Sequence, residues 1–194
     1  MKLKIAVLPG DGIGPEVTNE SIKVLNCIAK KFNHEVEMNE GLVGAIAIDH
    51  HNNPYPDETH NLCLESDAIL FGAIGDPKYD NDPKAKIRPE QGLLEMRKKL
   101  GLYANLRPTL VFDSLLHMSP IKEERITGTD ILFVRELTGG IYFGEPRGIK
   151  LIENGERKGV NTHTYTTSEI VRVARVAFDL AKKRSNKVTS CEKS

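Results

Sequence analysis

Cysteine is scarce in this sequence, and neither sign of charge dominates it. Only three cysteines occur among the 194 residues, Cys27, Cys63 and Cys191. Their odd number and wide spacing argue against a disulfide framework and indicate a reducing compartment. The 27 basic and 27 acidic residues cancel, so no overall electric field draws the chain toward nucleic acid or a membrane surface.

Long apolar segments, repeats and low-complexity tracts are also missing. The first four residues, MKLK, lead directly into a short strand-like run, and no apolar segment has the length of a signal-peptide core or a membrane span. We therefore expect a cytoplasmic protein without nucleic-acid or membrane partners. A chain of this length suits one large domain or parts of two.

The most informative stretch is ILFVRELTGGIYFGEPRG, residues 131–148. Residues 131–134 form an unbroken apolar run, which predicts a strand buried on both faces. Arg135 and Glu136 follow at once, so the strand ends at charges. Gly139 and Gly140 allow a tight turn, and residues 141–143 predict a second short strand. Many α/β enzymes place a site at strand ends in this way. If VRE stood alone, a strand and a tight turn with solvated charges would be the preferred interpretation.

The amino-terminal region predicts a strand, a glycine-rich turn and a helix. Residues 4–8 are aliphatic, PGDGIGPE follows at 9–16, and apolar residues then recur at helical spacing. Pro15 stands where a first-turn proline is tolerated. The glycine spacing is G-x-G-x-G and not the G-x-G-x-x-G of dinucleotide-binding turns. Such a turn also occurs for structural reasons alone, so it decides no function.

Three other segments contribute to the interpretation. Residues 90–100 predict a helix, and residues 150–165, which are polar with a central turn, predict a hairpin. Thr167 or Ser168 is expected to cap a helix with an apolar stripe. His50 and His51 fit no closed zinc pattern with their neighbours, and we interpret them as solvated loop residues.

Four motifs, in this order, resemble the β-decarboxylating dehydrogenases, the family of the isocitrate, isopropylmalate, homoisocitrate and tartrate dehydrogenases. They are LPGDGIGPE (8–16), RPEQGLLEMR (88–97), YANLRP (103–108) and VRELTGGIYFGEPRG (134–148), and they are most similar to the isopropylmalate branch. The resemblance runs along the whole chain and covers about the first half of a family member. It implies an α/β fold of the isopropylmalate/isocitrate dehydrogenase type, distinct from the ordinary Rossmann fold and incomplete at the carboxyl end.

The resemblance also implies two domains with different functions. Residues 1–99 match the amino-terminal part of the cofactor-side domain, and residues 100–194 match part of the second domain, which binds substrate and dimerises. A homodimer clasped partly by the hairpin at 150–165 is implied. The implied cofactor-binding residues are Ile13, Gly75, Asp76, Pro77 and Lys78. Asp76 stands where relatives usually have a second glycine, and its carboxylate would repel cofactor phosphates if it pointed inward.

The substrate that the family implies is a malate with two carboxylates, each of which suits a planar guanidinium fork. Three arginines match the family's carboxylate-binding positions, and a leucine pair beside an acid matches the positions that receive an isopropyl group. Such a pair favours a branched aliphatic group and disfavours a third carboxylate. The implied substrate-binding residues are Arg97, Arg107, Arg135, Glu90, Leu93 and Leu94.

The implied reaction is NAD-dependent oxidation of 3-isopropylmalate at C2 and loss of carbon dioxide, giving 4-methyl-2-oxopentanoate in leucine biosynthesis. A Mg²⁺ or Mn²⁺ ion polarises the carbonyl in the family. Tyr142 matches the tyrosine that protonates the enol carbon, and Lys193 matches the lysine that assists removal of the hydroxyl proton. None of the acids of this chain matches the metal ligands of the family. Two alternatives stay open: a sibling enzyme for another 2-hydroxy diacid, such as tartrate, malate or homoisocitrate, and a truncated chain without catalysis.

Overall fold

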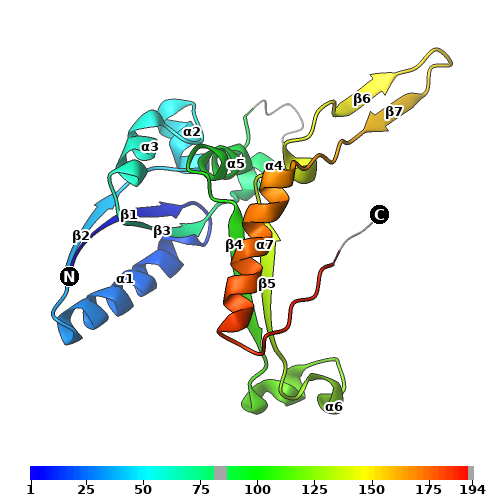
Figure 1. The fold of residues 1–194 in the computed structure, drawn as a ribbon. Helices are drawn as coiled ribbons and strands as arrows, with labels where there is room; N and C mark the ends of the chain where they lie inside the picture. The colour runs from blue at the N-terminus through cyan, green and yellow to red at the C-terminus, as the bar shows by residue number, and fades with distance from the viewer. Residues whose placement is uncertain (81–86, 192–194) are drawn as a thin grey trace. The chain divides into compact units, whose positions relative to one another are not determined.

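The computed structural model of the chain describes residues 1–80 and 87–191 (Figure 1). It divides into two compact units, Met1–Leu100 and Gly101–Ser194. Lys193, one of the two predicted catalytic residues, lies outside the described residues. No helix in the described ranges is long and apolar enough to cross a membrane.

The first unit is a parallel sheet with helices on both faces. Its elements are β1 (Lys2–Gly10), α1 (Gly14–Lys31), β2 (Glu35–Glu40), α2 (Ala45–His51), α3 (Asp57–Leu64), β3 (Ala68–Ala73), α4 (Pro77–Asp80) and α5 (Pro89–Lys99). The strand order is β2-β1-β3, and both neighbours run parallel to β1. Parallel strands need a crossover, and α1 supplies it between β1 and β2. The predicted strand, glycine-rich turn and helix are therefore confirmed.

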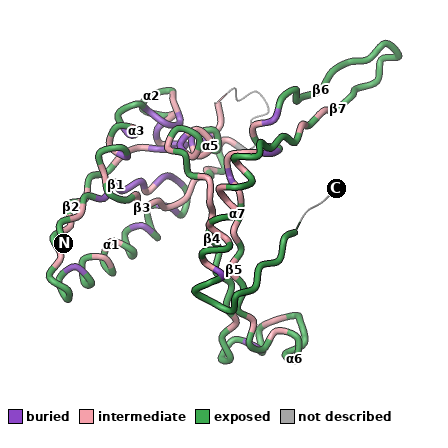
Figure 2. The backbone as a smooth tube through the Cα atoms, viewed as in Figure 1, coloured by how far each residue is buried: buried purple, intermediate pink, exposed green. Residues whose placement is uncertain are grey.

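The core of this unit lies against the central strand. Residues 5–8 of β1 are buried (Figure 2). Ala6 and Leu8 point to one side and join a cluster with Tyr55, Cys63 and Met96 from the α3 and α5 region. Ile5 and Val7 alternate to the other side, where α1 covers the sheet (Figure 1). A strand covered on both faces explains why the sequence of β1 is aliphatic without alternation.

The buried position of Cys63 leads to a testable difference among the three thiols. Cys63 is 5% exposed, whereas Cys27 and Cys191 are exposed, and burial raises the pKa of the Cys63 thiol. Because the thiolate is the reactive form, we expect Cys63 to react with dithionitrobenzoate at least about tenfold more slowly than the other two. The time course of colour release measures this, and the urea-unfolded chain, in which all three should react alike, is the control. Three equal rates in the native chain would contradict the burial of Cys63.

The second unit contains two antiparallel strand pairs and one long helix. Its elements are β4 (Ala104–Leu110), η1 (Asp113–Met118), α6 (Glu123–Ile126), β5 (Asp130–Glu136), η2 (Gly140–Tyr142), β6 (Gly148–Leu151), β7 (Arg157–Val160) and α7 (Thr167–Lys182). β4 pairs with β5, and β6 pairs with β7 as the predicted hairpin. α7 packs along β5 (Figure 1).

Several local predictions need correction. The run 131–134 is not buried on both faces, because Ile131 and Phe133 are 47% and 53% exposed in a two-stranded ribbon that α7 covers on one side. Residues 141–143 do not form a strand. At Gly140 the backbone has a positive φ of 77°, and the carbonyl of Gly140 accepts hydrogen bonds from the next turn, which produces the 3-10 helix η2.

Two boundaries also differ from the predictions. The cap of α7 is Thr166, one residue before the expected Thr167, and it forms a capping box with Glu169. His50 and His51 are the last residues of α2 and not loop residues. His51 Nε2 lies 3.1 Å from a carboxylate oxygen of Glu58 on α3, so this histidine links the two helices.

Candidate active site

Asp11, at the carboxyl end of β1, joins three segments of the first unit. It is 7% exposed. One carboxylate oxygen accepts a hydrogen bond from the N–H of Ala45 at the start of α2, and the other accepts one from the N–H of Gly75, at 2.5 Å, after β3. Gly44 has a positive φ of 82°, and a Cβ there would lie 2.3 Å from the carboxylate. Glycine at this position lets the backbone close around Asp11.

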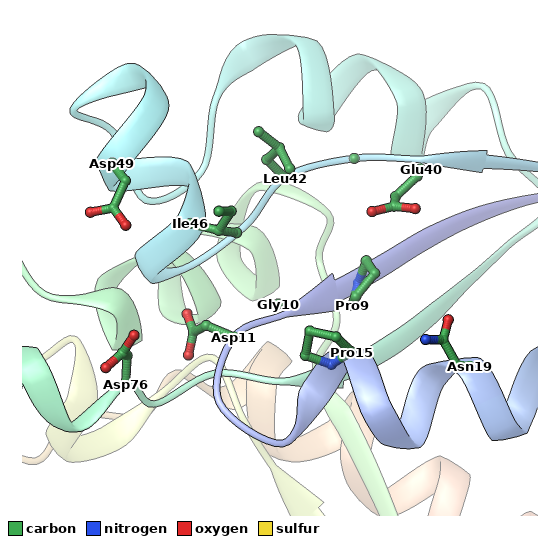
Figure 3. Close-up of a pocket in the computed structure, with 11 residues that line it drawn as sticks. Pro9, Gly10, Asp11, Pro15, Asn19, Glu40, Leu42, Ile46, Asp49 and Asp76 are labelled. Atoms are coloured by element: carbon green, nitrogen blue, oxygen red, sulfur yellow. The ribbon is translucent and has the colours of Figure 1, made fainter.

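A pocket of about 440 Å³ opens beside Asp11, at the carboxyl ends of β1 and β2 (Figure 3). Four acids, Asp11, Glu40, Asp49 and Asp76, line it, and none of its described lining residues is a lysine or an arginine. Carboxylates accept hydrogen bonds from sugar hydroxyls but repel phosphates. The pocket walls therefore suit the hydroxyl groups of a nucleotide better than its phosphates.

The loop after β3 contains most of the predicted cofactor-binding residues, and its charges are paired. The Asp76 carboxylate accepts the N–H of Lys78 at 3.0 Å, and the Lys78 ammonium forms an ion pair with Asp49 on α2. The hydroxyl of Tyr79 donates to the other oxygen of Asp49 at 3.0 Å. The hydrogen bond between Lys78 and Asp49 lowers the pKa of Asp49 and raises the pKa of Lys78, so both groups are charged at neutral pH.

Asp76 lines the pocket, yet part of its charge is offset. One of its oxygens lies 4.0 Å from the Lys78 ammonium, and the other accepts the Lys78 N–H. Gly75, just before it, has a φ of 141°, and a Cβ built there meets no described atom within 4 Å. Ile13, at the N-cap of α1, is 57% exposed. The loop thus offers an open backbone stretch, and Ile13 offers an accessible apolar side chain in the same unit.

Two of the three predicted substrate arginines share one face of the β4–β5 ribbon. Asn105 is opposite Arg135, and Arg107 is opposite Phe133. Because residues two apart point to the same face, Arg107 and Arg135 are diagonal neighbours, a relation that spans about 7–8 Å. Arg107 Nε donates to the side-chain oxygen of Asn105 at 2.6 Å. Both guanidinium groups belong to residues that are exposed, on the face opposite α7.

Arg135 is also brought together with the predicted catalytic tyrosine. Its Nη2 donates to the Tyr142 hydroxyl at 3.0 Å, and its guanidinium carbon lies 5.7 Å from the centre of the Tyr142 ring. The tyrosine is 44% exposed. A guanidinium that contacts the hydroxyl favours its oxygen as a hydrogen-bond acceptor and sets the direction in which the phenol points.

A buried carboxylate supports this region from the other side of the ribbon. The Glu136 side chain is 10% exposed and pairs with Arg172 of α7 at 2.8 Å. Burial alone would raise the pKa of Glu136, but hydrogen bonds from the Gly139 N–H, Arg172 and Thr138 together hold it below its ordinary value. The carboxylate therefore stays ionised and keeps α7 tied to the end of β5.

The remaining predicted substrate residues lie on α5 in the first unit. Glu90 is exposed, and Leu94 and Arg97 are half-buried. Leu93 packs against the core cluster. Of the two predicted leucines, Leu94 therefore has more side-chain surface left for a ligand than Leu93, which contacts the core.

Sequence reasoning missed the residues that hold the predicted ones in place. Asp11, Asp49 and Arg172 carry no special spacing, and their partners are 34, 29 and 36 residues away. The one available signal was at Asp11, an acid between glycines at a strand end. Within the described ranges, no group of three His, Cys, Asp or Glu residues is arranged to hold a metal ion.

Comparison with known proteins gives this geometry a family context. The family model for isocitrate/isopropylmalate dehydrogenases matches residues 4–194. The chain belongs to the isocitrate/isopropylmalate dehydrogenase family. It is 58% identical over its whole length to 3-isopropylmalate dehydrogenase of Pelagibacter ubique and 55% identical over 99% of its length to that of Aquifex aeolicus. It covers 52% of each, so this family member spans about half the length of the curated relatives it matches.

Solved structures agree with the fold of this family member. An isocitrate dehydrogenase from Methylococcus capsulatus matches 93% of the chain with a TM-score of 0.70 at 24% identity, which speaks for the fold alone. A β-decarboxylating dehydrogenase from Thermococcus kodakarensis matches 94% with a TM-score of 0.62 at 31% identity. The chain covers 48% and 46% of these proteins. The predicted α/β fold of the isopropylmalate/isocitrate dehydrogenase type is confirmed.

Proposed function

We propose that this chain carries the substrate-binding arginines and the proton-donating tyrosine of an NAD-dependent dehydrogenase that decarboxylates 3-isopropylmalate in leucine biosynthesis. The contact between Arg135 and Tyr142 carries the proposal, because a guanidinium group suits a carboxylate and a phenol hydroxyl next to it can donate a proton. The names of the relatives at 52–58% identity support the same substrate. A cytoplasmic homodimer is part of the proposal.

Substrate binding is assigned to the exposed face of the β4–β5 ribbon. Arg107 and Arg135 present two guanidinium groups on this face, and planar forks bind carboxylates bidentately. We assign Arg97 to the second carboxylate of the diacid. Leu93, Leu94 and the neighbouring Glu90 are assigned to the branched alkyl group, because an acid there disfavours a third carboxylate.

Proton transfer is assigned to Tyr142 and Lys193. The Tyr142 hydroxyl donates the proton to the enol carbon after carbon dioxide has left, and Arg135 keeps the hydroxyl directed while it does so. Lys193 assists removal of the C2 hydroxyl proton. Bound NAD would supply the acceptor for the hydride of C2. We assign its contacts with this chain to Ile13 and residues 75–78, where a Cβ built on Gly75 meets no described atom within 4 Å.

The described residues do not fit the divalent metal of the family. Acids do gather at the pocket beside Asp11, but no three of them form a metal-binding group. Asp11 and Asp49 are also already engaged with backbone N–H groups and with Lys78. No step of the proposed reaction is assigned to a metal held by the described residues.

The test joins this chain to the carboxyl-terminal half of the Pelagibacter ubique relative, to which it is 58% identical. We expect NADH formation from 3-isopropylmalate, and much slower formation from malate, tartrate or homoisocitrate. The 194-residue chain alone is expected to show negligible turnover. Faster use of another diacid would favour a sibling enzyme, and an inactive joined protein that folds would favour a chain without catalysis.

The substrate pocket gives a sharper prediction. Leu94→Ala in the joined enzyme should lower kcat/KM for 3-isopropylmalate by about tenfold or more, with little change for malate, because the lost methyl groups contact only the branched substrate. Steady-state NADH production with both substrates measures the ratio. Leu64→Ala, at a leucine that is 62% exposed on α3, is the matched control. An unchanged ratio for Leu94→Ala would remove Leu94 from the pocket.

A further inference from the structure

The carboxylate of Glu136 collects four hydrogen bonds at the end of β5. It accepts from the N–H groups of Thr138 and Gly139 at 2.8 and 2.6 Å, from the Thr138 hydroxyl at 2.9 Å, and from Arg172 at 2.8 Å. Three of these donors belong to the turn that follows the strand. Charged acceptors form the stronger hydrogen bonds, so this side chain contributes strongly to the conformation of the turn.

Arg172 connects that turn to α7. Its guanidinium bonds both to Glu136 and to the Thr138 hydroxyl, and its central carbon lies 4.7 Å from the centre of the Tyr103 ring. The side chain is 34% exposed, and its Nε is buried without a partner among the described residues. An arginine held by a charge, a hydroxyl and an aromatic face has little freedom to move.

Two other segments of the second unit also hold the turn. The N–H of Gly140 donates to the carbonyl of Thr164 at 2.9 Å. Gly140 has a positive φ, and a Cβ on it would lie 2.3 Å from the hydroxyl of Tyr165. Just before the turn, the N–H of Leu137 donates to the carbonyl of Tyr103 at 2.9 Å. Residues 137–140 are thus held on several sides, and η2 begins at once and ends at Tyr142.

We propose that Glu136 and Arg172 are positioning residues that hold the 137–140 turn and thereby direct the Tyr142 hydroxyl onto Arg135. This inference rests on the proposed function, since it concerns the same tyrosine. Arg135 and Glu136 are neighbours on opposite faces of β5. Arg135 contacts Tyr142 on one face, and Glu136 on the other face holds the backbone that connects β5 to η2. A solely structural ion pair would stabilise α7 against β5 without affecting Tyr142.

A double-mutant cycle separates these roles in the joined enzyme. Glu136→Gln keeps the size of the side chain but removes its charge, and should lower kcat by about tenfold or more. In a Tyr142→Phe background the same substitution should lower the residual kcat by less than about twofold, because the hydroxyl that it positions is gone. Equal losses in both backgrounds would overturn the proposal. Glu124→Gln, on the exposed helix α6, should leave kcat unchanged.

A second measurement on the 194-residue chain does not depend on activity. Amide hydrogen exchange at Thr138 and Gly139 should be at least about tenfold faster in Glu136→Gln, and the Tyr142 ring signals should shift. Arg172→Lys keeps the charge and loses the planar fork, so its amide exchange rates at Thr138 and Gly139 should lie between those of the parent and of Glu136→Gln. Unchanged exchange in both variants would overturn the positioning role. Faster exchange in a joined enzyme that oxidises no diacid would instead reject the proposed function and leave the positioning role standing.

Discussion

Replacing Arg135 by alanine is expected to lower kcat/KM for 3-isopropylmalate by about 100-fold to 1,000-fold in the joined enzyme. If Arg135 binds a substrate carboxylate as proposed, the variant loses a charge-assisted fork, a loss that costs about 3–4 kcal/mol when the other charge is left without its partner. It also loses the hydrogen bond that directs the Tyr142 hydroxyl, so kcat should fall together with the affinity.

Arg135→Lys discriminates between charge and geometry. It keeps the positive charge, but a lysine lacks the planar fork that reaches a carboxylate and a phenol at once, so we expect it to recover only part of the loss. Arg125→Ala, on the exposed helix α6, is the matched control and should retain full activity. If Arg135→Ala kept kcat/KM within about threefold of the parent, Arg135 would have no role in binding the substrate.

Replacing Asp11 by alanine is expected to lower the free energy of unfolding of the 194-residue chain by about 2–4 kcal/mol. Two hydrogen bonds to a buried carboxylate are lost, and the Ala45 N–H loses this acceptor while it stays buried. Urea unfolding followed by circular dichroism measures this change in the free energy of unfolding. Amide exchange at Gly75 should also become faster, because its N–H loses the Asp11 carboxylate as acceptor.

The control for Asp11 is another aspartate of the same unit. Asp57 pairs with Lys99 at 3.6 Å, but its side chain is 89% exposed, so Asp57→Ala should cost less than about 1 kcal/mol. Asp11→Asn keeps one acceptor oxygen, so its loss of stability should lie between those of Asp11→Ala and Asp57→Ala. Equal stabilities for Asp11→Ala and Asp57→Ala would show that the buried carboxylate contributes nothing to the fold.

The sequence predicted elements well where local chemistry and burial agree. β1 is aliphatic because both of its faces are covered. The following glycines permit a turn, and Pro15 suits the first turn of α1. The hairpin of β6 and β7 follows from its polar strands and central turn. The run before Arg135 was misread, because an apolar strand in a two-stranded ribbon has the same local pattern as one buried on both faces.

The chemistry of the site was readable only in part. The sequence supplied the residue types, arginines for carboxylates and a tyrosine for a proton, and the pairing of β4 with β5 placed Arg107 and Arg135 on one face. It did not supply the contacts that orient them. Glu136 looked like a solvated charge in the sequence, yet it is 10% exposed and holds a turn, because its partner Arg172 comes from a helix 36 residues away.

By itself, the sequence determined the family, the glycine turn after β1 and the residue types that suit a branched diacid, because these depend on local pattern and on motif order. Only the tertiary structure decided which acids are buried and what they hold. Asp11 and Glu136 gain their roles from backbone N–H groups and an arginine that the fold brings to them. A carboxylate leaves water only when enough donors surround it, and no local pattern in the chain records where those donors come from.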